Sequence, residues 1–138
     1  MAVEAVLFDL DGTLVDSLPL IIHTYRRVFD EMQIPWGDDD VVKMIGLPLL
    51  DIGRHFTGDA AELFCERYQH YYYQEHDRYI KLFPGTLEML ACLKDSGLQL
   101  GIVTSKGKPG TARATAFTGI DRYMDVLITA HDVAKHKP

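Results

Sequence analysis

Two aspartates, spaced by one residue, follow an apolar run near the start of the chain. Asp9 and Asp11 come directly after the run Ala5–Phe8 and are followed at once by Gly12 and Thr13. In an extended strand the side chains at i and i+2 leave on the same side, so the two carboxylates should lie close together. Like charges at short distance are costly unless a cation or a shared proton lies between them. This cost indicates a functional site rather than an ordinary strand end.

Further polar groups follow two later apolar runs. The first of these runs ends in Thr104, Ser105 and Lys106, and the second leads through Asp132 to Lys137. In a parallel sheet the functional crevice lies outside the carboxyl ends of the strands, where these groups would meet the aspartates. Such a set suits a phosphoryl group: a carboxylate acts as nucleophile, Mg²⁺ shields it, hydroxyl and N–H donors bind the oxygens, and a lysine balances charge.

The elements that must position these groups alternate between strand and helix. The run Ala5–Phe8 is typical of a strand buried on both faces, and the runs 98–104 and 125–130 have the same character. Residues 86–96 and 109–119 have the spacing and the flanking glycines and prolines of helices. Alternating strands and helices predict a parallel sheet with right-handed crossovers. The fold class is therefore α/β, with a Rossmann-like parallel sheet as its core.

Residues 16–81 contain helical patterns and no strand signal. Apolar residues recur at helical spacing over 20–32, and two more helices are expected over 49–56 and 60–78. The acidic run 38–40 is interpreted as the cap of a further short helix. The expected division is an α/β core made of 1–15 and 82–138 with an inserted helical segment of 16–81.

The composition is that of a globular protein with small-molecule partners. Of the 138 residues 47% are hydrophobic and 25% are charged, which is enough for a sizeable core. A formal net charge of −6 argues against binding to nucleic acid or to an anionic membrane. No signal peptide or membrane span is recognisable, so we expect a cytoplasmic protein. Cys65 and Cys92 are interpreted as buried, reduced thiols, and the oligomeric state is not predicted.

These motifs resemble those of a known enzyme family. The segment DLDGTLVD at 9–16, the later pair Thr104 and Ser105, and a lysine before Pro138 are similar to the motifs of the haloacid dehalogenase superfamily of phosphohydrolases. The helical insertion after the first motif and the segment GIVTSK resemble the phosphoglycolate phosphatase and pyrophosphatase branch, in which the insertion is a helical cap. The resemblance covers the whole chain. It implies a Mg²⁺-dependent phosphatase that hydrolyses a small phosphate monoester, such as phosphoglycolate, or pyrophosphate.

The resemblance also assigns catalytic roles. Asp9 would attack phosphorus and form an aspartyl phosphate, while Asp11 would protonate the leaving oxygen and then activate water. The Asp9 carboxylate and the Asp11 carbonyl would both bind Mg²⁺. Lys137, which stands directly before Pro138, matches the charge-balancing lysine of the family better than Lys135 does.

Binding roles follow from the same resemblance. Thr13 would offer a hydroxyl and an amide beside the acids, while Thr104 and the Ser105 amide would bind the phosphoryl oxygens. Gly46 opens a segment that resembles the substrate loop of the cap, and Arg54 is near enough in sequence to reach the anionic end of a substrate. A small phosphorylated metabolite is thus the expected partner.

One departure from the family pattern concerns the metal site. The family has a further acidic motif, usually GDxxxD, on a strand beside the first one, and this chain contains no such segment before Pro138. We therefore expect a truncated chain or gene fragment whose core is incomplete at the C-terminus, with the first strand as an apolar edge. Asp132 is the candidate for a third metal ligand, and the chain alone is expected to be weakly active.

Other functions fit the sequence less well. A non-catalytic phosphate binder is an alternative because the acidic motif is missing. A receiver-type signalling domain is disfavoured because helices stand where its phosphorylated strand should be. A phosphomutase is disfavoured because Pro48 and Leu49 replace the polar residues expected after Gly46. Lys106 and Lys108 are interpreted as surface charges rather than catalytic groups.

Overall fold

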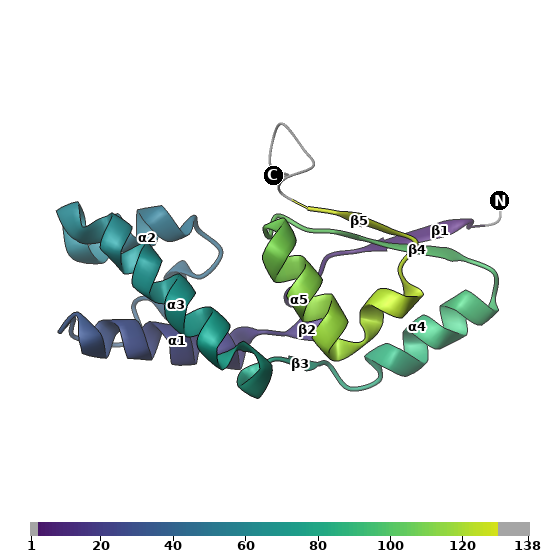
Figure 1. The fold of residues 1–138 in the computed structure, drawn as a ribbon, viewed down its shortest axis with the longest axis horizontal. Coiled ribbons are helices and arrows are strands. Elements are labelled where there is room, and N and C mark those ends of the chain that lie inside the picture. Colours follow the sequence, from purple (N-terminus) through teal and green to yellow (C-terminus); the bar gives the residue numbers. More distant parts are fainter. Residues whose placement is uncertain (1–2, 130–138) are drawn as a thin grey trace. The chain divides into compact units, whose positions relative to one another are not determined.

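The computed structural model describes residues 3–129, which separate into two compact units (Figure 1). We call Met1–Ser17 with Ile80–Pro138 the sheet unit, and Leu18–Tyr79 the helical unit. Asp132, Lys135 and Lys137 lie outside the described residues, so their predicted roles stay predictions. Across the described part, no helix is both long and apolar enough to cross a bilayer.

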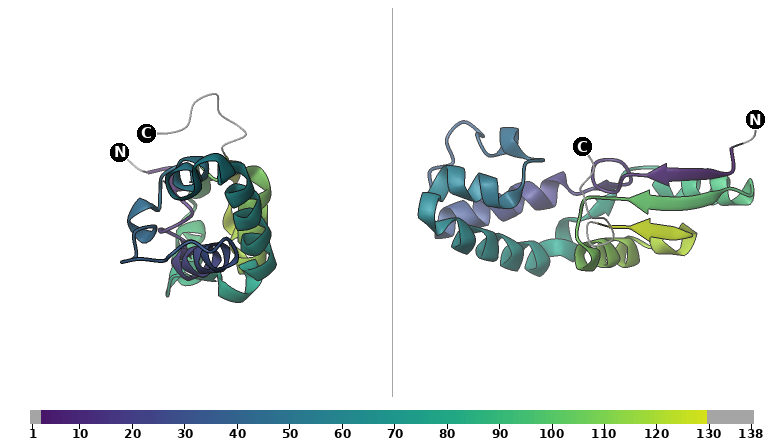
Figure 2. Two further views of the ribbon diagram at one scale, coloured as in Figure 1. Left: turned by 90° about the vertical axis from the view of Figure 1, so that its left-hand side faces the viewer. Right: turned by 90° about the horizontal axis from the view of Figure 1, so that it is seen from above.

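The sheet unit is a three-stranded parallel sheet with connecting helices. Strand β4 lies between β1 and β5, and both pairings are parallel. Figure 2 shows α4 and α5 on the same face of this sheet, as right-handed crossovers in one direction require. The predicted α/β class is therefore confirmed. The bounds of these elements are β1 (Ala5–Phe8), α4 (Thr86–Asp95), β4 (Gln99–Val103), α5 (Lys108–Thr118) and β5 (Val126–Ile128).

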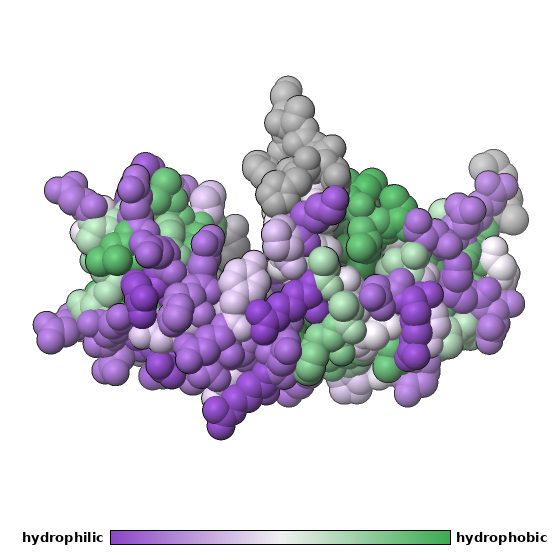
Figure 3. All heavy atoms as spheres, in the orientation of Figure 1, coloured by the Kyte–Doolittle hydropathy of each residue, from purple (hydrophilic) through white to green (hydrophobic). Residues whose placement is uncertain are grey.

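The two faces of the sheet differ in burial. Leu100 and Ile102 of the central strand are at most 1% exposed on the face that α4 and α5 cover. On the opposite face Leu7, Gly101 and Val126 form one row across the three strands, and Leu7 and Val126 are 59% and 45% exposed. Apolar side chains are visible over the strands in Figure 3. A side chain on Gly101 would not fit, because its Cβ would lie 2.5 Å from Val126 Cγ1 and 2.9 Å from Leu7 Cδ2.

The first strand departs from one prediction and agrees with another. Burial of β1 on both faces is wrong, because its residues alternate between exposed and half-buried. The expectation that β1 forms an apolar edge is confirmed among the described residues, where it pairs with β4 alone. Strand β1 thus has the apolar composition of a central strand, although it lies at the edge of the described sheet.

A short antiparallel ribbon connects the turn after β1 to the later part of the sheet unit. It consists of β2 (Val15–Asp16) and β3 (Lys81–Leu82), with Asp16 opposite Lys81. The Phe83 N–H donates to the Leu14 carbonyl at 3.2 Å and extends the pairing. The sequence carries no strand signal at 16 or 81, because two residues are too few to show a period.

The helical unit contains three helices around an aromatic core. Tyr25 and Phe29 of α1 pack with Phe64 of α3 and with Ile52 of α2, and all four side chains are at most 4% exposed. The predicted helices are thus present, and the aromatic residues of α3 pack as expected. The bounds are α1 (Leu18–Glu31), α2 (Leu49–Thr57) and α3 (Ala61–Tyr79).

Two smaller predictions are wrong. The acidic run 38–40 does not cap an α-helix: only a 3-10 turn follows at Val42–Met44, with no side-chain cap, while Asp39 accepts a 2.6 Å hydrogen bond from Trp36 Nε1. The thiols are free, as predicted, but neither is fully buried: Cys65 is half-buried and Cys92 is exposed.

Candidate active site

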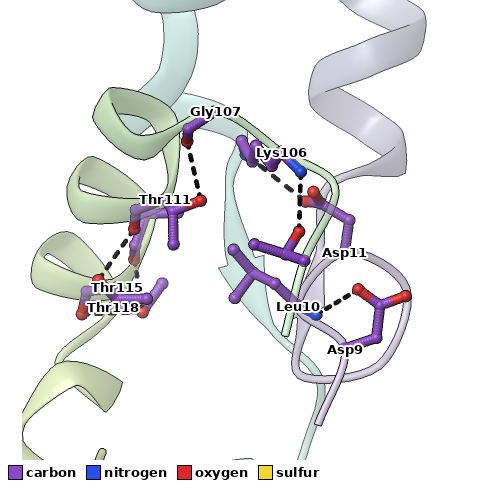
Figure 4. Close-up of polar contacts among 10 residues, drawn as sticks. Asp9, Leu10, Asp11, Lys106, Gly107, Thr111, Thr115 and Thr118 are labelled. Carbon is purple, nitrogen blue, oxygen red and sulfur yellow. Dashed lines mark hydrogen bonds and ion pairs between the residues drawn. The ribbon is translucent and has the colours of Figure 1, made fainter. Parts of the chain in front are cut away.

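The candidate site lies at the carboxyl ends of β1 and β4. These strands are parallel neighbours with Phe8 opposite Ile102, so the chain leaves both at the same edge of the sheet. Asp9 and Asp11 follow the first strand, and Thr104 and Lys106 follow the second. Figure 4 shows Asp9, Asp11 and Lys106 at this edge. The predicted meeting of acids and hydroxyl is therefore seen in the sheet unit. The ammonium beside them belongs to Lys106, whereas the predicted charge-balancing Lys137 lies outside the described residues.

A tight turn holds the two acids. The Leu10 carbonyl accepts the N–H groups of Thr13, Leu14 and Val15 at 3.3, 3.0 and 3.1 Å, and Gly12 donates to the Val15 carbonyl at 2.9 Å. Leu10 is fully buried and anchors the turn. Gly12 has a φ of +82°, a left-handed conformation that glycine adopts without steric cost. The sequence DLDGT thus reverses the chain within a few residues and fixes the backbone between the acids.

The Asp9 carboxylate is exposed and is directed by its own backbone. Its Oδ1 accepts the Leu10 N–H at 2.8 Å, so the side chain lies against the turn (Figure 4). An exposed carboxylate with a fixed orientation is suited to attack on a ligand that arrives from solvent.

Asp11 has a different environment. Its Oδ1 is buried and has no hydrogen-bond donor among the described residues, while Lys106 Nζ lies 3.6 Å away. The Lys106 side chain is only 15% exposed, so the interpretation of this lysine as a surface charge is wrong. Figure 4 shows Asp11 directed at Lys106 from the neighbouring loop. Sequence reasoning missed this contact, because the pattern of residues does not report the paths of the two loops that form it.

Hydrogen bonds hold the loop that carries Lys106. The Thr104 N–H donates to the Ile128 carbonyl at 2.9 Å and continues the pairing of β4 with β5. The Lys106 N–H donates to Thr104 Oγ1 at 3.1 Å, and Thr111 Oγ1 donates to the Gly107 carbonyl at 2.9 Å. The lysine therefore starts from a backbone that is tied to the sheet on one side and to α5 on the other.

The other proposed binding residues are placed as follows. Thr13 is exposed and its amide donates to the Leu10 carbonyl at 3.3 Å, so its hydroxyl is the group left to meet a ligand, and its binding role stays a prediction. Ser105 is exposed at the loop start. Gly46 and Arg54 belong to the helical unit, where Gly46 has a φ of +109° and the exposed Arg54 lies 3.9 Å from Asp51. The described predicted residues of the sheet unit thus follow the carboxyl ends of two neighbouring parallel strands, whereas Lys137 lies outside the described part.

The residues at this edge fit Mg²⁺. Carboxylate and carbonyl oxygens are the ligands that this ion prefers, and the exposed Asp9 carboxylate and the Asp11 carbonyl supply one of each at the turn after β1. Among the described residues no group of three or more His, Cys, Asp or Glu side chains could hold a metal. Mg²⁺ commonly binds through one or two carboxylates together with substrate phosphates and water, which matches the pair Asp9 and Asp11.

Comparison with known proteins supports the resemblance seen in the motifs. Residues 6–138 match the model of the haloacid dehalogenase-like hydrolases. Pyrophosphatase PpaX of Bacillus velezensis is 34% identical over 137 residues, which are 99% of this chain and 63% of the relative. Pyrophosphatase PpaX of Oceanobacillus iheyensis is 30% identical over 138 residues, which are 100% of this chain and 64% of the relative. The chain thus spans slightly less than two thirds of the length of these curated relatives.

Solved structures agree with the fold. A haloacid dehalogenase-like family hydrolase from Streptococcus pneumoniae superposes with a TM-score of 0.83 at 27% identity, over 92% of this chain and 61% of that one. A structure described as a predicted phosphoglycolate phosphatase from Haemophilus somnus gives a TM-score of 0.86 at 24% identity, over 99% of this chain and 66% of that one. At that identity the second likeness establishes the fold alone.

Proposed function

Since the chain belongs to the haloacid dehalogenase-like hydrolase family, we propose that its protein hydrolyses small phosphate compounds through an aspartyl phosphate on Asp9. The observation that carries the proposal is the convergence of Asp9, Asp11, Thr104 and Lys106 at the carboxyl ends of two neighbouring parallel strands. An exposed acid, a second acid beside it, a hydroxyl and a cation are the groups that transfer of a phosphoryl group requires.

In the proposed reaction Asp9 is the nucleophile, and Asp11 is the general acid and then the general base. An Asp9 oxygen attacks phosphorus while the bond to the leaving oxygen breaks, and Asp11 donates its proton to that oxygen. Water then attacks the phosphorus of the aspartyl phosphate, Asp11 accepts the water proton, and phosphate and the Asp9 carboxylate are released. Mg²⁺ held by the Asp9 carboxylate and the Asp11 carbonyl would screen the repulsion between the acid and the anionic substrate.

Hydroxyl groups complete the proposed phosphoryl site. The Thr13 and Thr104 hydroxyls and the Ser105 amide would donate to the phosphoryl oxygens, where negative charge gathers in the transition state. The charge-balancing role of Lys137 stays a prediction, because this residue lies outside the described part.

The helical unit is proposed to act as a cap that selects the substrate, with Gly46 and Arg54 as its contacts. Pyrophosphate is the first substrate to test, because two relatives at 30% and 34% identity are named pyrophosphatases. Phosphoglycolate and similar monoesters are the second group, since the guanidinium of Arg54 could pair with a substrate carboxylate.

The test is Asp9→Asn in the protein continued to the length of its relatives. We expect phosphate release to fall at least about a thousandfold, because an amide is neither a nucleophile nor a good Mg²⁺ ligand. Asp95→Asn is the matched control, since Asp95 is an exposed acid at the end of α4 in the same unit. Turnover of Asp9→Asn at the rate of Asp95→Asn would overturn the proposal.

A further inference from the structure

Two features of the contact between Asp11 and Lys106 have no part in the proposed reaction. Asp11 Oδ1 is buried without a hydrogen-bond donor among the described residues, and the Lys106 ammonium lies 3.6 Å from it. Nothing in the local turn orients the Asp11 carboxyl group, whereas that of Asp9 accepts the Leu10 N–H at 2.8 Å. A general acid must be held within hydrogen-bond reach of the leaving oxygen, so some group must orient it.

Lys106 is placed to do this from a fixed loop. Its own N–H donates to Thr104 Oγ1 at 3.1 Å, and the Thr104 N–H donates to the Ile128 carbonyl at 2.9 Å. The side chain is 15% exposed, so its ammonium is less screened by solvent than that of a typical surface lysine. A series of contacts thus runs from β5 through Thr104 and Lys106 to the Asp11 carboxylate.

We propose that Lys106 is a positioning residue that holds the Asp11 carboxyl group toward the phosphoryl site by joining the turn after β1 to the loop before α5. This inference rests on the proposed phosphatase function and concerns the acid–base step alone. Without the ammonium, the Asp11 side chain can rotate away from the site, since the described residues provide no hydrogen-bond donor for its Oδ1.

The proposal makes a specific kinetic prediction. Loss of Lys106 should slow the step in which Asp11 donates a proton, and this step matters most for substrates with poor leaving groups. A lysine that simply bound the phosphoryl group would instead raise KM by a similar factor for every substrate. The two roles therefore differ in the kinetic parameter affected and in the dependence on the leaving group.

The experiment compares Lys106→Met, Lys106→Arg and Lys108→Met in the protein continued to the length of its relatives. Lys108 is the matched control, because it is an exposed lysine two residues further on, at the first position of α5. Each variant is assayed with a series of aryl phosphates of increasing leaving-group pKa and with pyrophosphate, and its thermal unfolding is measured.

We expect Lys106→Met to lower kcat about 10- to 100-fold for the poorest leaving groups and less than about threefold for the best, with little change in KM. Lys106→Arg should restore kcat to within about fivefold of wild type, because it keeps a cation in place, and Lys108→Met should match wild type. The conservative variant also keeps the test valid if Lys106→Met unfolds.

Three results would overturn the inference: wild-type kinetics in Lys106→Met, an equal loss across the leaving-group series, or a rise in KM alone. Failure of the proposed function is distinguishable, because wild type itself would then release no phosphate, or Asp9→Asn would stay active. An active wild type with an inactive Asp9→Asn but an unaffected Lys106→Met would remove only the role of Lys106.

Discussion

The two ends of the three-stranded sheet hold their acidic residues in opposite ways. At the amino end, Asp125 precedes β5, and its Oδ2 accepts both the Leu100 N–H and Lys94 Nζ at 2.8 Å. At the carboxyl end, Asp11 Oδ1 is buried without a donor, and its cationic neighbour Lys106 lies 3.6 Å away. One acid has the hydrogen bonds that hold strands and helix together, and the other lacks them.

This difference indicates what each end is for. Hydrogen bonds to a charged acceptor contribute to stability, and those from Lys94 and then from Leu100 lower the pKa of Asp125. A buried carboxylate oxygen without a donor costs stability, and such a cost is expected where a ligand or a proton is later received. The amino end therefore supports the fold, and the carboxyl end is where the proposed reaction would take place.

The largest effect that separates the two ends is expected for Asp11→Asn. Removal of the proton donor should lower kcat with poor leaving groups by about 100- to 10,000-fold, with a smaller loss for good leaving groups. Stability should change little, because the half-buried Asp11 side chain accepts no hydrogen bond at its buried Oδ1 among the described residues. Steady-state kinetics and thermal unfolding of the same samples measure both effects, and a large loss of stability would contradict the assignment.

A change in the middle of the sheet should affect stability alone. Gly101→Ala would place a Cβ 2.5 Å from Val126 Cγ1 and 3.2 Å from the Val126 carbonyl oxygen, which cannot move without disturbing β5. We expect a loss of about 1–3 kcal/mol in the free energy of unfolding, measured with urea. Val126→Ala in the same chain should recover part of this loss, and full stability of Gly101→Ala would show that the strands are spaced differently.

The smallest effect is expected at the amino end. Asp125→Asn should lower the melting temperature at neutral pH and leave kcat unchanged, because it removes the charged partner of Lys94. The pKa of Asp125 is lowered in the folded state, so its contribution is complete above the ordinary carboxyl pKa of about 4 and is lost as the pH falls through the lowered pKa. Melting curves of both proteins should therefore converge in acid.

Lys94→Met provides the matched control for that prediction. It removes the other half of the same contact, so the losses of the two single variants should not add in the double variant. Additive losses, or a difference between wild type and Asp125→Asn that persists in strong acid, would show that the contact does not stabilise the sheet unit.

The sequence was enough to predict the groups at the carboxyl end of the sheet, but not those at the amino end. Parallel strands end at the same edge, so the runs before Asp9 and Thr104 were enough to predict that acids and hydroxyl meet. The contact between Asp11 and Lys106 was missed because it depends on the paths of two loops, which no period in the sequence reports. The role of Asp125 was missed because a single acid before a strand has no distinguishing pattern.

The errors in the fold also arise where the sequence shows no repeating pattern. Helices and strands with several turns or alternations were predicted, whereas the two-residue strands β2 and β3 and the 3-10 turn after 38–40 were not. The burial of β1 was predicted from its apolar composition. Composition shows that a strand can pack on both faces, but not whether other residues cover those faces, and in the described part β1 stays partly exposed.

The central claim is that Asp9 carries the phosphoryl group, and chemical trapping tests it most directly. The protein continued to the length of its relatives is quenched during turnover of pyrophosphate and reduced with borohydride, which converts an aspartyl phosphate to homoserine. Peptide mass spectrometry then locates the reduced residue. The account predicts homoserine at position 9 in wild type and none in Asp9→Asn. Reduction at Asp11 or at another carboxylate, with phosphate release that persists in Asp9→Asn, would contradict it.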